Sequence, residues 1–194
     1  METKLRRTLA AGLLLAIAHV TAAQAQEAMT LDQMIAAAPA IVVATVESRR
    51  AEPEFYGSSR LIITKVTLRI EETIKGSVPR THVIEVLGGT LGDQTLHVSH
   101  VPEFRVGDRD VLFLSNAAHA VSPLVGSDQG RFRVLTDNET GTPRVLTLGF
   151  EPVTALSQIG AERTTVARKM TAALSLGDFV TAVRDRVRVL GARQ

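Results

Sequence analysis

The sequence predicts a mainly β protein, an antiparallel barrel or sandwich with a short N-terminal helix and a C-terminal amphipathic helix. About seven or eight short segments rich in Val, Ile, Leu and Thr follow one another, separated by turns that contain Gly, Pro, Asn or Asp. This spacing is typical of a barrel or a sandwich and differs from that of a parallel sheet, in which helices alternate with strands. The chain of 194 residues contains no cysteine, so burial of apolar side chains has to stabilise the fold without disulfides.

Residues 1–25 have the features of a secretory signal peptide. A positively charged start is followed by an apolar stretch over residues 9–20 and by the small-residue motif Ala23-Gln24-Ala25. We therefore expect export to the periplasm or the medium, with cleavage after Ala25 and Gln26 as the first residue of the mature chain. The apolar stretch is short for a membrane span, and no later run reaches the roughly 20 apolar residues that a span needs.

The first helix and the strands follow from local patterns. Thr30 and Gln33 have the spacing of a capping box, which predicts a short helix over 31–37 before Pro39. The longest strand pattern extends from residue 60 to 74, and its even-numbered residues from Ile62 to Ile70 are expected to face the core. Further strands are predicted over 41–46, 81–87, 94–98, 110–114, 121–125, 130–135 and 144–148. Loops are predicted over the polar or glycine-rich segments 47–58, 88–93 and 126–130.

The last part of the chain has a different composition. Residues 151–173 are rich in Ala and Thr without a clear period, which predicts a linker. Ser175 and Asp178 then predict the start of a helix over 176–190. Its apolar stripe is expected to dock on the β domain, and contact of this basic helix with a membrane or a partner is the alternative. The predicted division is a signal peptide over 1–25, a β-barrel domain over 26–150 and a linker plus C-terminal helix over 151–194.

Charge and aromatic content argue against a nucleic-acid partner. The chain has a net charge of +2, and removal of the signal peptide takes away three basic residues and one acidic residue, which leaves the two signs balanced. A surface that binds single-stranded nucleic acid needs exposed aromatic side chains on which bases stack. The chain contains only one Tyr and six Phe, some of them in buried strand patterns. We therefore expect no nucleic-acid partner.

Few residues have the spacing of a catalytic or metal site. His97 and His100 resemble a metal-binding pair, but residues three apart on a strand point to opposite faces. A site there would need a sharp bend and a further ligand such as Asp93 or Glu103. No cysteine can ligate zinc or act as a nucleophile, and no Gly-x-Ser-x-Gly motif is present. We therefore predict no catalytic residue and no cofactor, with His97 and His100 as the weak metal candidates.

A series of short motifs over residues 30–135 resembles a group of uncharacterised exported bacterial proteins. The motifs, in chain order, are Ile41-Val-Val-Ala-Thr-Val46, Ile74-Lys75-Gly76, Gly88-Gly89, Pro102-x-Phe104-x-x-Gly107-Asp108, Val111-Leu-Phe-Leu114 and Gln129-Gly130-x-Phe132. The first half is also similar to the netrin-like domain, whose best-known members are the tissue inhibitors of metalloproteinases. That resemblance implies an OB-like antiparallel β-barrel with a flanking helix. These inhibitors bind the protease zinc through an N-terminal cysteine, which this chain lacks.

Two hypotheses for the function remain. The first is an exported, non-catalytic binding module that engages a secreted or envelope protein, possible partners including a secreted metalloprotease, through the loops of the barrel. The loop residues proposed for binding are Glu54, Tyr56, Gly88, Gly89, Asp128 and Gln129. The two glycines among them predict a tight turn with positive φ rather than a phosphate-binding loop. The alternative is an enzyme whose site is assembled from scattered loop residues and depends on a metal around His97 and His100.

Overall fold

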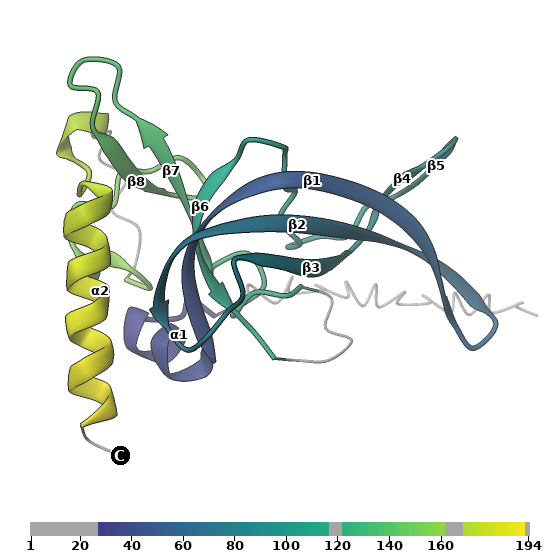
Figure 1. Cartoon of the computed structure of the whole chain (residues 1–194), viewed down its shortest axis with the longest axis horizontal. Coiled ribbons are helices and arrows are strands. Elements are labelled where there is room, and N and C mark those ends of the chain that lie inside the picture. The colour runs from purple at the N-terminus through teal and green to yellow at the C-terminus, as the bar shows by residue number, and fades with distance from the viewer. Residues whose placement is uncertain (1–26, 117–121, 162–168, 193–194) are drawn as a thin grey trace, which may run out of the picture.

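The computed structural model describes residues 27–116, 122–161 and 169–192, and the mainly β prediction is confirmed. Six antiparallel strands form one sheet in the order β3-β2-β1-β6-β7-β8 (Figure 1). The strands of this sheet are β1 (Ala40–Tyr56), β2 (Ser59–Lys75), β3 (Thr81–Leu87), β6 (Arg109–Leu114), β7 (Arg131–Thr136) and β8 (Pro143–Thr147). A separate small hairpin is formed by β4 (Gly89–Leu91) and β5 (Gln94–Leu96), so the loop predicted over 88–93 is wrong for residues 89–91, whose backbone pairs with β5. The helices are α1 (Leu31–Ala37) and α2 (Leu176–Gly191), with 3₁₀ turns at Leu156–Gln158 and Met170–Ala172.

The sheet is open, with β3 and β8 as its two edges. No backbone pairing joins these edges among the described residues, so the OB-like barrel remains a prediction. The strand predicted over 121–125 is absent from the described part of that segment, where Leu124 forms only an isolated bridge with Leu114. The predicted signal peptide over 1–25 lies outside the described residues. In the described residues no helix is long and apolar enough to cross a membrane.

The loop predicted over 47–58 is wrong, because most of this segment is strand. β1 continues through it to Tyr56, paired with β2 as far as Ser59. The pairing register shifts between Val46 and Ser48, which marks a β-bulge at Glu47. Beyond the bulge the hairpin increasingly lacks a third strand and a helix layer, so both of its faces can carry polar residues. The polar, non-alternating sequence of this segment therefore reflects a strand with solvent on both faces, and it does not indicate a loop.

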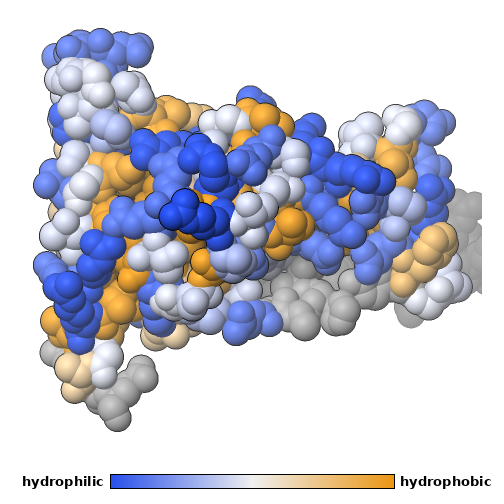
Figure 2. All heavy atoms as spheres, in the orientation of Figure 1, coloured by the Kyte–Doolittle hydropathy of each residue, from blue (hydrophilic) through white to orange (hydrophobic). Residues whose placement is uncertain are grey.

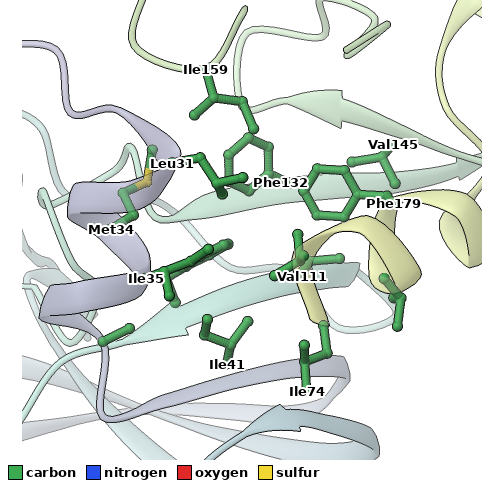
Figure 3. Packing of buried hydrophobic residues seen from close by; sticks show 14 of the residues in the cluster. Leu31, Met34, Ile35, Ile41, Ile74, Val111, Phe132, Val145, Ile159 and Phe179 are labelled. Carbon is green, nitrogen blue, oxygen red and sulfur yellow. The ribbon is translucent and has the colours of Figure 1, made fainter. Parts of the chain in front are cut away.

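One apolar cluster lies between the sheet and the two helices (Figure 3). The ring of Phe132 lies 5.7 Å from that of Phe113 and 5.4 Å from that of Phe179, centroid to centroid, so β6, β7 and α2 meet at three aromatic side chains. Phe179 and Val183 of α2 are fully buried, and Val187 and Leu190 pack at the border of the cluster. α2 is thus docked by its apolar stripe. Ion pairs of Arg184 with Glu72 and of Arg186 with Asp32 flank the contact.

A second apolar cluster covers the opposite face of β1, β2, β3 and β6. Val66 and Leu68 are buried in it, which agrees with the face predicted for the longest strand. Phe104, from the loop that precedes β6, closes the cluster from outside the sheet. The predicted capping box at the start of α1 is also confirmed, since Thr30 and Gln33 bond each other's backbone N–H groups.

Candidate functional site

The most prominent feature of the surface is the end of the β1–β2 hairpin, which we call the arm (residues 53–62). β3 pairs with β2 only from Ile63 to Arg69, and Gly88 N–H bonds the carbonyl of Ile62 at 2.7 Å, so between Pro53 and Leu61 the two strands of the arm pair with each other alone. Figure 1 shows the arm projecting away from α2 and from β6–β8. The visible surface over it is mainly hydrophilic (Figure 2). Phe55 is the exception within the arm, because 69% of this residue is exposed.

Two of the predicted binding residues, Glu54 and Tyr56, lie in the arm on either side of Phe55. Glu54 is half-buried and lies opposite Leu61 in the pairing register, and Tyr56 pairs with Ser59 next to the turn. The turn itself contains Gly57 at φ 61°, where an added Cβ atom would meet nothing within 4 Å. The structure therefore brings these two predicted residues to one end of the molecule.

The base of the arm is held on its outer face by charge pairs. Lys65 Nζ lies 2.9 Å from Glu52 Oε2, and Arg50 Nε lies 3.3 Å from Glu52 Oε1. The hydrogen bond from Lys65 lowers the pKa of Glu52 below its ordinary value. Such solvent-exposed pairs contribute little to stability. Arg50 and Lys65 lie directly opposite each other in the register, and Glu52, which pairs with both, offsets the repulsion between these two like charges.

Gly88 and Gly89 turn the chain from β3 into β4, and both have the positive φ that the sequence predicted, at 107° and 133°. A Cβ atom at Gly88 would lie 2.8 Å from the carbonyl oxygen of Leu96, and one at Gly89 would lie 2.2 Å from Oγ1 of Thr64. The hydroxyl of Thr64 donates to the Gly88 carbonyl at 2.6 Å. These glycines let β4 cross close to the arm's base near Ala51. Gly88 and Gly89 therefore contribute through the backbone conformation that they allow, which sets the path of the chain from β3 into β4.

Gln129 contacts the chain's own N-terminal segment. Its Oε1 accepts from the backbone N–H of Met29 at 2.7 Å, and its Nε2 donates to the carbonyl of Glu27 at 3.0 Å. Gly126 and Gly160 leave the space that Met29 needs, since a Cβ at either would lie within 3.0 Å of it. The side-chain amide of Gln129 is therefore engaged within the chain. The neighbouring Asp128 is half-buried, and its carbonyl accepts from Arg131 N–H at 3.3 Å.

The two histidines proposed as a metal pair are both exposed. His97 follows β5, and His100 has a positive φ of 60° in the next turn. Asp93 lies in the β4–β5 turn, and the side chain of Glu103 is 74% exposed. Among the described residues no three His, Asp or Glu side chains come close enough together to hold a metal ion.

We predict that the purified protein contains no stoichiometric zinc and that a chelator leaves its melting temperature unchanged. A chelator lowers the melting temperature only of a protein whose bound metal contributes to the free energy of folding. The described residues offer no cluster of three ligands for such a metal. Metal analysis of the purified protein and thermal unfolding with and without EDTA measure both points. Stoichiometric zinc that disappears in a His97→Ala/His100→Ala double variant would contradict this prediction and support the enzyme alternative.

A buried charged cluster that sequence reasoning missed lies at the start of β6 and β7. Arg131 is fully buried, and its Nη2 lies 2.8 Å from Oδ2 of both Asp108 and Asp110. Arg133 bonds the other oxygen of Asp108. The guanidinium carbon of Arg131 lies 4.2 Å from the centre of the Phe104 ring. We call these residues the Arg131 cluster.

The two carboxylates of the Arg131 cluster respond differently to their surroundings. Burial raises the pKa of Asp110, and the attraction of Arg131 does not offset it. For Asp108 burial also acts to raise the pKa, but the backbone N–H of Arg105 and the Arg131 guanidinium together lower it. Asp110 Oδ1 and Arg131 Nε have no hydrogen-bond partner among the described residues.

The Arg131 cluster explains the motif Pro102-x-Phe104-x-x-Gly107-Asp108 in structural terms. Phe104 covers Arg131, the carbonyl of Glu103 accepts from Arg131 Nη1 at 2.5 Å, and Asp108 receives the backbone N–H of Arg105 at 2.9 Å. The motif therefore anchors the loop before β6 to β7. The signal that could have found the cluster is the same i, i+2 spacing of opposite charges in two segments, Asp108 and Asp110 at the start of β6 and Arg131 and Arg133 in β7. We interpret the cluster as structural because its charges face one another in the interior.

A shallow depression of about 560 Å³ lies elsewhere on the surface, lined by Glu47, Arg69, Ile70, Glu71, Arg80 and Thr81. Its main charges are already paired. Arg109 bonds Glu71 through two nitrogens at 2.7 and 2.9 Å, and Thr45 donates to the same carboxylate at 2.5 Å. Burial acts to raise the pKa of Glu71, and these hydrogen bonds lower it overall. The two carboxylates that line the depression, Glu47 and Glu71, are therefore already engaged by arginines of the chain.

The chain matches no protein-family model, no curated protein and no solved structure. The function therefore has to be inferred from the geometry of the molecule, in which the arm is the candidate binding surface.

Proposed function

We propose that this chain is an exported, non-catalytic binding module that engages a secreted or envelope protein through the arm. The observation that carries the proposal is the exposed Phe55 on a two-stranded projection. Single exposed apolar residues are common on protein surfaces. Phe55 differs because it lies on a projection that few other segments support, so burial of its ring would require a partner.

The face of the arm that carries Phe55 also supports the proposal. Ala51, Pro53 and Phe55 share one face because side chains alternate along a strand. This is the face that β4 approaches at the base of the arm, where the Cβ position of Gly89 lies 3.6 Å from Ala51 Cβ. A partner on this face would contact Phe55 and the β4–β5 hairpin together. The predicted loop region 88–93 thus joins the arm in one surface.

The resemblance to netrin-like domains adds a partner class and a finer architecture to the proposal. It suggests a secreted metalloprotease as the partner and an OB-like barrel as the arrangement of the strands. Inhibition through an N-terminal cysteine is excluded by composition. Under this proposal the arm supplies the contact, without a ligand to the protease zinc.

Site-specific photo-cross-linking in the exported fraction of the source organism tests this proposal. We predict that p-benzoylphenylalanine at position 55 forms one discrete cross-linked product, because its ring would lie against the partner. The matched control places the same residue at Val106, which is 63% exposed but outside the arm. Identical products from both positions, or none from position 55, would contradict the proposal.

A further inference from the structure

The two edges of the sheet are protected to different extents. The β8 edge is covered by its own chain: Val145 N–H donates to Leu174 O at 3.0 Å, and the Val145 carbonyl accepts from Val153 N–H at 3.1 Å. At the β3 edge, the described residues provide no backbone hydrogen bond to the side that faces away from β2. An unprotected strand edge is a template for pairing with another chain.

The register identifies which groups of β3 are open. Gly88 N–H bonds Ile62 O, and Ile70 N–H bonds Arg80 O, so the hydrogen-bonded pairs between β2 and β3 involve even-numbered residues of β3. The N–H and C=O groups of the odd-numbered residues Thr81, Val83, Glu85 and Leu87 therefore point outward. The pairing of β3 with β2 has no register shift, and β3 contains no proline. Nothing in the strand itself bends or blocks this edge.

We propose that two copies of this chain associate through antiparallel pairing of their β3 strands, with Val83 on the two-fold axis. In this register Val83 lies opposite its own copy, and Thr81 lies opposite Glu85 on both sides of the axis. Val83 is 48% exposed at the middle of the edge, and the pairing would cover it with an apolar neighbour. Each odd-numbered pair would exchange two backbone hydrogen bonds.

The side chains favour this register over its neighbours. An axis at Glu85 would place two carboxylates directly opposite each other, which is destabilising. An axis at Ile84 would place Val83 opposite Glu85, an apolar side chain against a charged one. Of these three registers, only the axis at Val83 places two apolar side chains opposite each other at the centre, pairs no Val83 with Glu85, and keeps the two Glu85 side chains apart. A two-fold interface is self-complementary in this way.

The absence of cysteine makes a direct test possible, because Val83→Cys introduces a single thiol. Residues directly opposite in a hydrogen-bonded antiparallel pair have Cα atoms about 5.5 Å apart, which is within the range of disulfides. We expect mild oxidation of the exported protein to convert Val83→Cys into a covalent dimer. In the matched variant Glu85→Cys the two thiols would lie about 14 Å apart along the strands, and dimer formation should be at least about tenfold slower.

The mass of the protein in solution provides the second measurement. Sedimentation equilibrium should show a dimer of the wild type that dissociates on dilution. Val83→Lys places two like charges at the axis and should remain monomeric at the same concentrations, with unchanged far-UV circular dichroism. A wild type that is monomeric throughout, a Val83→Lys variant that dimerises equally, or equal oxidation rates of the two cysteine variants would overturn the proposal. These outcomes do not depend on whether the arm binds a partner.

Discussion

Replacement of Arg131 by methionine should lower the free energy of unfolding by about 3–5 kcal/mol, because it leaves buried carboxylates without their partner. Asp110 is 1% exposed and forms its ion pair with Arg131. The substitution also removes one of the two arginines that pair with Asp108. Urea denaturation followed by circular dichroism measures the change. Arg105→Met is the matched control, since this side chain is 76% exposed and lies 4.0 Å from its partner Glu103. Its loss should cost less than about 1 kcal/mol.

A double variant separates the effect of an unpaired charge from a simple loss of packing. If the unpaired carboxylate is the cause, Arg131→Met together with Asp110→Leu should be less destabilised than Arg131→Met alone. Replacement of a buried ion pair by apolar side chains is often close to neutral. Equal effects of Arg131→Met and Arg105→Met would contradict the structural role of the Arg131 cluster.

Leu68→Asp should abolish cooperative unfolding or lower stability by more than about 4 kcal/mol. Leu68 is fully buried among the apolar side chains of the second cluster, where a carboxylate would lose its hydration. Thr67→Asp is the control on the opposite face of the same strand, where Thr67 is only half-buried and lies opposite the exposed Val83. It should unfold cooperatively. A soluble Leu68→Asp variant with the melting temperature of the wild type would contradict the assigned face.

The parts of the fold that sequence predicted are those with a local signal. The Thr30 capping box, the alternation in β2 and the apolar stripe of α2 each depend on residues close together in the chain. The end of β1 was missed because alternation disappears where solvent meets both faces of a strand. Closure of the sheet was predicted from the number and spacing of strands. Such spacing does not determine whether the last strand pairs with another strand or with its own following segment, as β8 does with 151–153.

In the candidate site, too, the sequence predicts the features that depend on neighbouring residues and misses those that depend on residues far apart in the chain. Positive φ at Gly88 and Gly89 follows from residue type, and the structure agrees. The Arg131 cluster joins residues more than 20 positions apart, and no single segment predicts it. The role of Gln129 was also hidden, because its backbone partners Glu27 and Met29 lie about 100 residues earlier in the chain.

The most direct test of the arm as the binding surface is the affinity of the cross-linked partner, once identified, for three matched proteins. These are the wild type, Phe55→Ser and Val106→Ser, which remove exposed apolar side chains inside and outside the arm. We predict that Phe55→Ser weakens binding at least about tenfold, a change of about 1.4 kcal/mol. Val106→Ser should stay within about twofold of the wild type, and both variants should unfold like it. Wild-type affinity in Phe55→Ser, or equal weakening in both variants, would contradict the proposal.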